Sequence, residues 1–484
     1  MVDSTDSDDR DSGPNQGTAT GPVRQTVELL VLLVLCVIVV RTFSAEAYVV
    51  PTGSMAPTLL GWHREIDCPN CGYRFDVGID EEGISGPAVC PNCGESGLDS
   101  VPAVECGGDR VLVQKFLYDF RPPKRWEVAV FHYPGDPSQA YVKRVVGLPG
   151  ESIRIEAGDV YADGQILRKT LEEQRAIRIP VHESRFEPRD ADRFPRWTFR
   201  SGWGYRSTRT GWSRIEGRFI HQARSGVGPG DWVIYQHWDP HRARYGPVRD
   251  FYAYNGGEMP SDNEIADLGL EAELTADRSV EALSVALRSG ADQFVVRIPV
   301  GLKGSVELTH NGVRVPILER SNPFQGHAPW PESFRLEASA FDRRVTVAID
   351  GKLLFEPYDY EHPRRGMGRG EAPLGLGVDG GSITIHNLKI FRDIYYTATL
   401  AGMPRAGRSI HSSVELGSDE FFVLGDNSPV SNDSRFWGVG PVVPGSMLLG
   451  KPFLVHLPGA LVPLKVFGRS VCWVPDPRRI RYIR

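Results

Sequence analysis

The 484-residue sequence predicts a mainly β protein organised in two or three domains. Short segments rich in Val, Ile, Tyr and Phe recur with Gly and Pro between them, and no long amphipathic helical pattern interrupts them. The segments that predict strands in the first third of the chain are 48–59, 110–117, 127–133, 140–147 and 152–162. Later stretches alternate apolar with polar residues, as in Arg344–Gly351, which ends in an Asp-Gly turn signal.

Composition narrows the class of protein. Apolar residues make up 41% of the chain and charged residues 24%, which is typical of globular domains. The formal net charge of −6 gives no broad basic field, so nucleic acid is excluded as an expected partner. The basic end Arg478–Arg484 is either a solvated tail or a contact for anionic lipid headgroups.

The N-terminal region predicts a disordered tail over residues 1–25 and a transmembrane anchor over 26–43. The tail is rich in Asp, Ser, Gly and Thr and lacks the apolar content that ordering requires. The apolar stretch Val27–Arg41 is shorter than the roughly 20 residues that span a bilayer, but Thr42 and Phe43 extend it. A cleaved secretory signal is the alternative, because Ala45-Glu46-Ala47 has suitably spaced small residues. The acidic flank before the stretch favours the uncleaved anchor.

A candidate serine nucleophile follows this stretch. Ser54 lies in Pro51–Leu59, and a serine is a poor nucleophile unless a neighbouring base takes its proton. Lys143 is the candidate base, because apolar residues flank it in Ala140–Gly150. Burial can lower a lysine pKa by up to about 3–5 units, which makes the neutral amine accessible near neutrality. The sequence therefore predicts a Ser54–Lys143 dyad.

Four segments that occur in order resemble bacterial type I signal peptidase. They are Pro51–Leu59, Asp109–Phe116 with Arg125–Phe131 after it, Lys143–Gly150 and Gly425–Gly438. Gly-Ser-Met alone carries little information, whereas the ordered set is specific. The chain departs from the family at Ser428–Val430, where the family usually has a charged, polar stretch.

The resemblance implies a role for each matching residue. Ser54 would be the nucleophile and Lys143 the general base, and Ser431 would orient the lysine amine. Thr52 and the Ser54 backbone N–H would stabilise the oxyanion. Asp433 and Arg435 would form a supporting acid–base pair behind the lysine.

The resemblance also implies an activity and a location. The chain would be a membrane-anchored serine endopeptidase, a hydrolase that removes signal peptides from exported pre-proteins without a cofactor for catalysis. It would lie in the bacterial inner (cytoplasmic) membrane as a single-pass protein, with the tail in the cytoplasm and the catalytic domain on the outer, periplasmic side, and the secretion translocase would be a further partner. The implied fold is a β-fold core with the active site along one apolar edge, where an extended substrate docks by strand addition.

Two CxxC motifs predict a zinc-ribbon-like insertion over residues 64–100. Cys68 and Cys71 form one motif, Cys90 and Cys93 the other, and four thiolates at this spacing can surround one tetrahedral Zn²⁺. Such a site is closed, so the zinc would be structural. Two disulfides are the alternative, because the outer compartment is oxidising. The remaining Cys106 and Cys472 have no assigned partner.

The remaining domain boundaries follow from these motifs. The peptidase core covers 44–174 and resumes at 416–484, so residues 175–415 are a second insertion. Its alternating strands resemble, weakly, the concanavalin-type lectin and laminin-G-like β-sandwiches. Its tryptophans are expected in the core, and the sequence identifies no ligand for it.

Two rival functions remain at this stage. A self-cleaving repressor-type peptidase uses similar Ser-Lys chemistry, but the apolar stretch and the lack of a DNA-binding region argue against it. The second rival is a membrane-anchored surface protein that binds carbohydrate or a partner through the sandwich, with the peptidase core as a scaffold.

Overall fold

A computed structural model gives the structure of the chain, and it divides the chain into two compact units, residues 1–46 and 47–484. The described residues are 21–43, 45–79, 87–189, 191, 194–203, 209–223, 230–256, 263–300, 304–320, 322–324, 332–361, 372–397, 412–459, 461–466 and 469–483. Most of the predicted tail, residues 1–20, lies outside this set, as do the side chains of Cys36 and Cys472.

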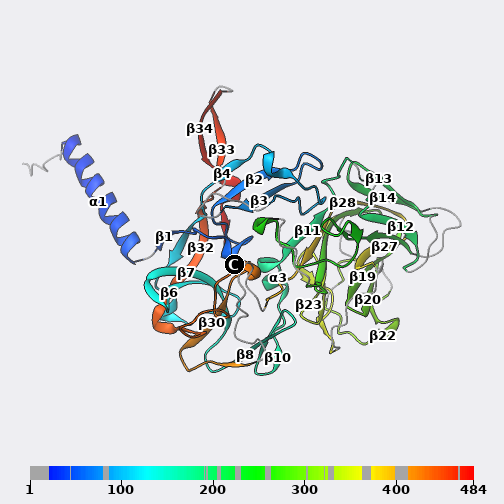
Figure 1. Ribbon diagram of the computed structural model, residues 1–484. Coiled ribbons are helices and arrows are strands. Elements are labelled where there is room, and N and C mark those ends of the chain that lie inside the picture. Colours follow the sequence, from blue (N-terminus) through cyan, green and yellow to red (C-terminus); the bar gives the residue numbers. More distant parts are fainter. Residues whose placement is uncertain are drawn as a thin grey trace, which may run out of the picture. The chain divides into compact units, whose positions relative to one another are not determined.

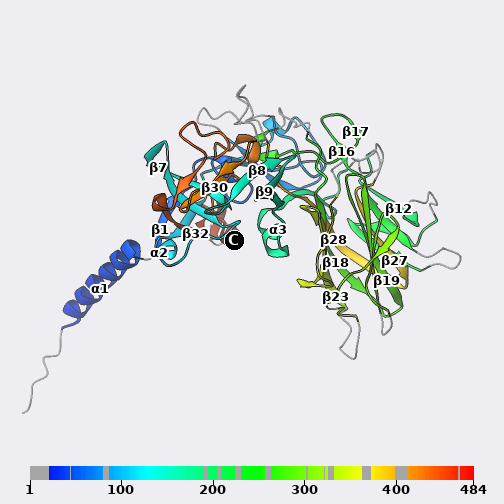
Figure 2. The same ribbon diagram turned by 90° about the horizontal axis from the view of Figure 1, so that it is seen from below.

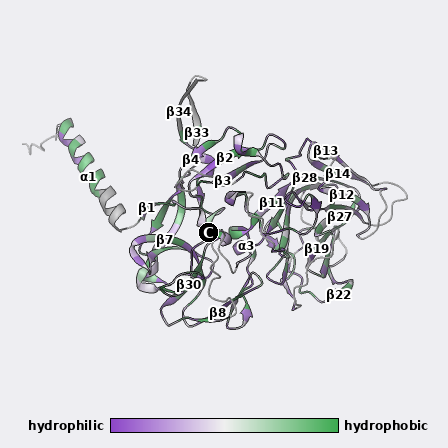
Figure 3. Ribbon diagram, viewed as in Figure 1, coloured by the Kyte–Doolittle hydropathy of each residue, from purple (hydrophilic) through white to green (hydrophobic). Residues whose placement is uncertain are grey.

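The first unit contains one helix, α1 (Pro22–Phe43), over the stretch that the sequence predicts as an anchor. The side chains from Leu29 to Leu35 are apolar and exposed, and Figure 3 shows hydrophobic colouring along much of α1. Among the described residues, however, none of the helices combines the length and the apolar character needed to cross a membrane.

The second unit begins with the sheets of the core, which segments from both ends of the chain build together (Figure 1). The largest of them has eight strands, in the order β1 (Ala45–Val49), β5 (Arg110–Gln114), β32 (Leu448–Leu457), β6 (Val128–Tyr133), β7 (Asp136–Gly147), β30 (Glu420–Leu424) and β31 (Val443–Pro444), with β35 (Arg481–Tyr482) paired to β32. A four-stranded sheet has the order β10 (Gln165–Ile166), β9 (Asp159–Ala162), β8 (Ser152–Glu156) and β29 (Val414–Glu415). Strand β30 therefore pairs with β7 although the whole 175–415 region separates them in sequence.

Residues of the predicted second insertion form two further sheets that share one hydrophobic core (Figure 2). One sheet has β13 (Trp212–Ile215), β14 (Arg218–Gln222), β28 (Ser382–Arg392), β18 (Leu268–Ala276), β23 (Ser333–Phe341), β24 (Arg344–Ile349) and β25 (Lys352–Leu353), with β11 (Ile179–Glu183) on β28 and β26 (Tyr358–Asp359) on β24. The other has β12 (Trp197–Ser201), β15 (Asp231–Tyr235), β27 (Leu374–Gly380), β19 (Val280–Ser289), β20 (Asp292–Pro299), β21 (Glu307–His310) and β22 (Val313–Val315). Leu270 and Leu336 from the first sheet and Val285 and Val296 from the second belong to the same buried cluster, so the sheets pack face to face.

Small elements complete the unit. The cysteine motifs lie in the connections of a three-stranded sheet of β3 (Arg74–Gly78), β2 (His63–Asp67) and β4 (Val104–Cys106), one before and one after β3 in the chain. Two hairpins pair β16 (Trp238–Asp239) with β17 (Arg244–Tyr245) and β33 (Leu461–Val466) with β34 (Arg469–Pro475). The helices are α2 (Leu117–Phe120) and α3 (Leu171–Ile177), and α3 begins with a capping box between Thr170 and Glu173.

The mainly β prediction is confirmed, but two predicted strands differ in detail. Segment 48–59 is a strand only to Val49, because Pro51 and Pro57 lack the N–H that a ladder needs, and a 3₁₀ turn, η1 (Gly53–Met55), follows. Segment 152–162 is a hairpin in which Ala157 and Gly158 both have positive φ, of 50° and 88°. This is the two-residue turn that matches the twist of the paired strands.

Candidate active site

Ser54 is a buried residue of the loop directly after β1. The turn η1 places it between Gly53 and Met55, and its side chain is 8% exposed. Met55 and Leu59 are fully buried in a cluster with residues of β5 and β6, and this packing anchors the loop to the large sheet. Asn427 holds the loop from the opposite side, because its backbone N–H donates to the Ser54 carbonyl at 3.1 Å.

Lys143 lies on β7, between β6 and β30, where Ala129 is its direct cross-strand neighbour. Its side chain is buried, and its Nζ lies 2.6 Å from Ser54 Oγ. The structure thus brings together the two residues that the sequence predicts as a dyad. Burial lowers the pKa of Lys143 to about 8, because the ammonium form loses its hydration.

Two opposite charges lie near the lysine and partly offset each other. Arg435 donates to both Asp433 carboxylate oxygens, from Nε at 2.8 Å and Nη2 at 2.7 Å. Asp433 raises the pKa of Lys143 and Arg435 lowers it, but desolvation has the larger effect and sets the direction. The buried pair that the resemblance implies is therefore present, and its Asp433 Oδ2 also accepts from the Gly425 N–H at 2.9 Å.

Thr52 and Ser431 both lie near Ser54, but only the Thr52 hydroxyl is within hydrogen-bond distance of the Ser54 hydroxyl. Thr52 is exposed in extended backbone, and its Oγ1 lies 3.5 Å from Ser54 Oγ. Ser431 is fully buried, and its Oγ has no hydrogen-bond partner among the residues that the structure describes. A Cβ built on Gly425 would lie 2.1 Å from Ser431 Oγ and 2.5 Å from the Ser54 carbonyl oxygen, so only glycine allows this approach. The orienting role implied for Ser431 remains a prediction.

A buried ion pair lies beside the dyad, and the sequence reasoning did not assign it a role. Arg144 donates to both Asp426 oxygens, at 2.7 and 2.5 Å, and neither side chain is exposed. Thr58 Oγ1 donates to the same carboxylate at 2.5 Å, which ties the Ser54 loop to the segment after β30. Arg144 and Asp426 both lie inside segments that resemble the signal peptidase family. The sequence signal for the ion pair was therefore the presence of Lys-Arg in one segment and Gly-Asp-Asn in the other.

The sequence reasoning also missed a segment of the second insertion. Tyr252, Tyr254 and Asn255 lie on and before the short turn η3 (Ala253–Asn255), and all three contact the Ser54 loop or the residues that hold it. No motif marks this segment, so no sequence signal could have found it.

The four cysteines of the CxxC motifs come together as expected for a metal site. Their Sγ atoms all lie within 4.8 Å of one another, with Cys68 3.6 Å from Cys93 and Cys71 3.7 Å from Cys90. These distances are too long for disulfides, and the cysteines are free thiols in this structure. Four ligands at about 2.3 Å from a tetrahedral Zn²⁺ lie about 3.8 Å apart, so the thiols fit the ion.

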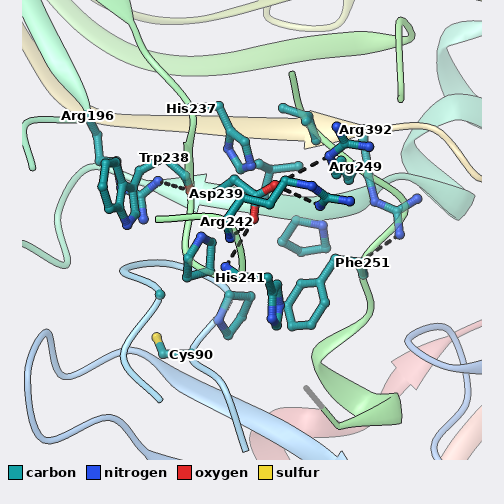
Figure 4. Close-up of a pocket in the computed structure, with 16 residues that line it drawn as sticks. Cys90, Arg196, His237, Trp238, Asp239, His241, Arg242, Arg249, Phe251 and Arg392 are labelled. Atoms are coloured by element: carbon teal, nitrogen blue, oxygen red, sulfur yellow. Dashed lines mark hydrogen bonds and ion pairs between the residues drawn. The ribbon is translucent and has the colours of Figure 1, made fainter. Parts of the chain in front are cut away.

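A separate pocket lies between the second cysteine motif and the hairpin of β16 and β17 (Figure 4). Its arginines are already engaged: Arg242 and Arg249 pair with Asp239 at 3.1 and 3.4 Å, and Arg392 donates to the Phe251 carbonyl at 2.9 Å. None of the predicted dyad or oxyanion residues lines this pocket. It is therefore distinct from the candidate active site.

Comparison with known proteins gives a partial match. The family model described as "Signal peptidase, peptidase S26" matches residues 99–198 and 343–457. Signal peptidase I of Leptolyngbya laminosa is 28% identical over 32% of this chain and 57% of its own length. The probable signal peptidase I-1 of Synechocystis is 28% identical over 33% of this chain and 64% of its own length. The chain thus spans less than two thirds of these relatives.

Among solved structures, the carbohydrate binding module CBM66 from Bacillus subtilis is 13% identical, with a TM-score of 0.23 over 41% of this chain and 93% of that one.

The residues that match the signal peptidase family model do not include Ser54 but include Lys143, and the second matched range includes Asp433 and Arg435. Residues 99–198 and 343–457 are therefore similar in sequence to the peptidase S26 signal peptidases.

Proposed function

We propose that the chain is a serine endopeptidase that cleaves N-terminal signal peptides from exported pre-proteins, with Ser54 as nucleophile and Lys143 as general base. The 2.6 Å separation between Lys143 Nζ and Ser54 Oγ is the observation that carries the proposal, because a general base must lie within about 2.6–3.2 Å of the heavy atom whose proton it removes. The pKa of Lys143 near 8 supports it further, since a fraction of the amine is neutral at physiological pH.

The proposed reaction has two halves. Ser54 Oγ attacks the scissile carbonyl carbon while its proton passes to Lys143 Nζ, and the carbonyl oxygen becomes an oxyanion. The Ser54 N–H and Thr52 Oγ1 donate to this oxyanion. When the C–N bond breaks, Lys143 returns the proton to the leaving amine, and the acyl group stays on Ser54. Lys143 then takes a proton from water while the water oxygen attacks the acyl carbon. When the bond between the acyl carbon and Ser54 Oγ breaks, Lys143 returns this proton to Ser54 Oγ, and the carboxylic acid leaves.

Three further roles complete the proposal. Asp433 with Arg435 fixes the segment after β30 behind the lysine, and Ser431 orients the amine once substrate displaces solvent. Four cysteines hold a structural Zn²⁺ that takes no part in the reaction, since Cys68, Cys71, Cys90 and Cys93 fill all four tetrahedral positions.

Membrane attachment through α1 is also part of the proposal. Seven consecutive exposed apolar residues, Leu29–Leu35, would leave water on contact with a bilayer, and attachment confines enzyme and substrate to one thin layer. Deletion of residues 1–43 should move the protein from the membrane fraction to the soluble fraction. Retention in the membrane fraction would count against α1 as the anchor.

The function is tested with two variants of the purified protein. Ser54→Ala and Lys143→Met should each abolish cleavage of a precursor supplied in trans, while circular dichroism and the melting transition show a folded protein. Cleavage in trans also separates this function from that of a self-cleaving repressor-type peptidase. Normal processing by either variant would refute the dyad.

A further inference from the structure

A short segment of the second insertion lies directly against the loop that carries Ser54. Tyr252 precedes the turn η3, is 5% exposed, and donates from its hydroxyl to the Asp426 carbonyl at 2.9 Å. Asp426 belongs to the segment that follows β30. The insertion is therefore hydrogen-bonded to Asp426, and the next residue, Asn427, is hydrogen-bonded to the proposed catalytic serine.

Asn255 reaches the serine loop through one other residue. Asn255 and Asn427 form a reciprocal amide pair, in which Asn255 Nδ2 donates to Asn427 Oδ1 at 2.8 Å and Asn427 Nδ2 donates back at 2.6 Å. Asn427 Nδ2 also donates to the Gly53 carbonyl at 3.0 Å, and its backbone N–H donates to the Ser54 carbonyl at 3.1 Å. Asn427 thus fixes the peptide groups on both sides of the Ser54 Cα, and Asn255 fixes the plane of the Asn427 amide.

Tyr254 packs against the same loop. A Cβ built on Gly53 would lie 2.0 Å from Tyr254 Cε1, and one built on Gly78 in β3 would lie 2.4 Å from the same atom. The ring therefore packs against two glycine backbones, one in the serine loop and one in the cysteine-bearing subdomain. Its hydroxyl donates to the Trp62 carbonyl at 2.9 Å, which fixes the ring at its outer end.

We infer that Tyr254 and Asn255 are positioning residues for Ser54, so that the inserted domain contributes to the geometry of the active site. The inference rests on the proposed function, because it assigns these residues to the reaction of Ser54. Neither side chain touches the reacting atoms, and both act through the backbone of Gly53 and Ser54. A displacement of about 1 Å in a reacting group can lower the rate about 100-fold.

The test measures kcat and KM for precursor cleavage by the full-length protein. Asn255→Leu removes both bonds of the amide pair at similar volume, and Tyr254→Ala removes the ring that covers Gly53. Each variant should lower kcat about 100-fold and change KM less than about threefold, because the serine moves while the substrate-binding edge stays. Tyr254→Phe keeps the ring and should retain most of the activity.

Tyr245→Ala is the matched control, because Tyr245 belongs to the same insertion and its hydroxyl also donates to a backbone carbonyl, that of Pro195 at 3.1 Å. It should leave kcat unchanged, and an equal loss of kcat in this control would overturn the inference. Melting temperatures of all four variants identify any that unfold. If Tyr254→Ala does not fold, the loss of kcat in Asn255→Leu and the retained activity of Tyr254→Phe still test the inference.

A second readout separates this inference from the proposed function. Acylation of Ser54 by an activated ester, followed by mass spectrometry, should be slowed about as much as kcat in Asn255→Leu and Tyr254→Ala. Wild-type rates of acylation and cleavage in both variants would overturn the positioning role alone. A wild-type protein that neither cleaves a precursor nor acylates at Ser54 would overturn both.

Discussion

Lys143 owes its lowered pKa to burial more than to its charged neighbours. Desolvation lowers its pKa, Asp433 and Asp426 act in the opposite direction, and Arg435 adds to the lowering. The balance leaves the pKa at about 8, so the protonated form dominates at pH 7 and the neutral form at pH 9.

This balance predicts a pH profile. Only the neutral amine accepts the Ser54 proton, so kcat/KM should rise about tenfold per pH unit below pH 7 and level off above about pH 9. Asp433→Asn removes a charge that raises the pKa of Lys143, so the midpoint should move to lower pH in this variant. Rates of precursor cleavage between pH 6 and 9.5 provide the measurement. A profile that is flat across pH 6–9 would contradict the lysine base.

At the scale of the element, β7 presents two adjacent basic residues to two different partners. Successive side chains of a strand point to opposite faces, so Lys143 reaches Ser54 while Arg144 reaches Asp426. Both sites are buried, and each links β7 to a segment far away in the sequence. The strand thus assembles the proposed dyad and the ion pair that holds the segment after β30.

Breaking this ion pair should be costly. Asp426→Asn leaves the Arg144 charge buried without a carboxylate, so the free energy of unfolding should fall by about 3–5 kcal/mol. Glu156→Gln is the control, because the Arg154–Glu156 pair is 34% and 48% exposed, and its loss should cost less than about 1 kcal/mol. Urea unfolding of the two variants measures the difference. Equal destabilisation would contradict a structural role for the buried pair.

At the scale of the whole molecule, polar contacts join the core sheets, the cysteine-bearing subdomain and the inserted sandwich within residues 47–484. Lys169 Nζ bonds Asp342 at 2.7 Å and Asp393 at 2.7 Å, all three being buried. Asn92, between Cys90 and Cys93, donates to the Phe186 carbonyl at 2.8 Å and accepts from the Glu183 N–H at 2.6 Å. The insertion is therefore tied to the core and is not a freely tethered module.

The cysteine site should bind zinc and stabilise this assembly. Purified protein should carry stoichiometric zinc by metal analysis, and Cys68→Ser should lose it because a thiolate ligand is missing. Chelation should lower the melting temperature for the same reason. Cys106→Ser is the control, since Cys106 lies outside the four-sulfur cluster and should keep the metal. Protein without zinc and without titratable thiols would favour disulfides.

The sequence predicted the mainly β class and the proximity of Ser54 to Lys143. Strand periodicity and family motifs are local patterns, so they can be recognised without knowledge of the tertiary structure. The sequence could not predict the Tyr254 and Asn255 contacts, since these depend on how the insertion folds back on the core. The sequence also overestimated the length of the strand at 48–59, because the prolines of the motif lack the backbone N–H that strand pairing needs. The motifs thus led to the proposed dyad, whereas the contacts that hold its loop depend on tertiary packing.

The pairing of β7 with β30 has a consequence for synthesis on the ribosome. The residues of β30, which pair with β7, the strand of Lys143, are translated only after the entire sandwich has been synthesised. A nascent chain therefore holds the serine and the lysine long before it can enclose them, and the amine stays hydrated and protonated in the meantime. If Ser54 and Lys143 form the proposed dyad, the nascent chain is consequently inactive, and cleavage begins only after β30 has paired with β7.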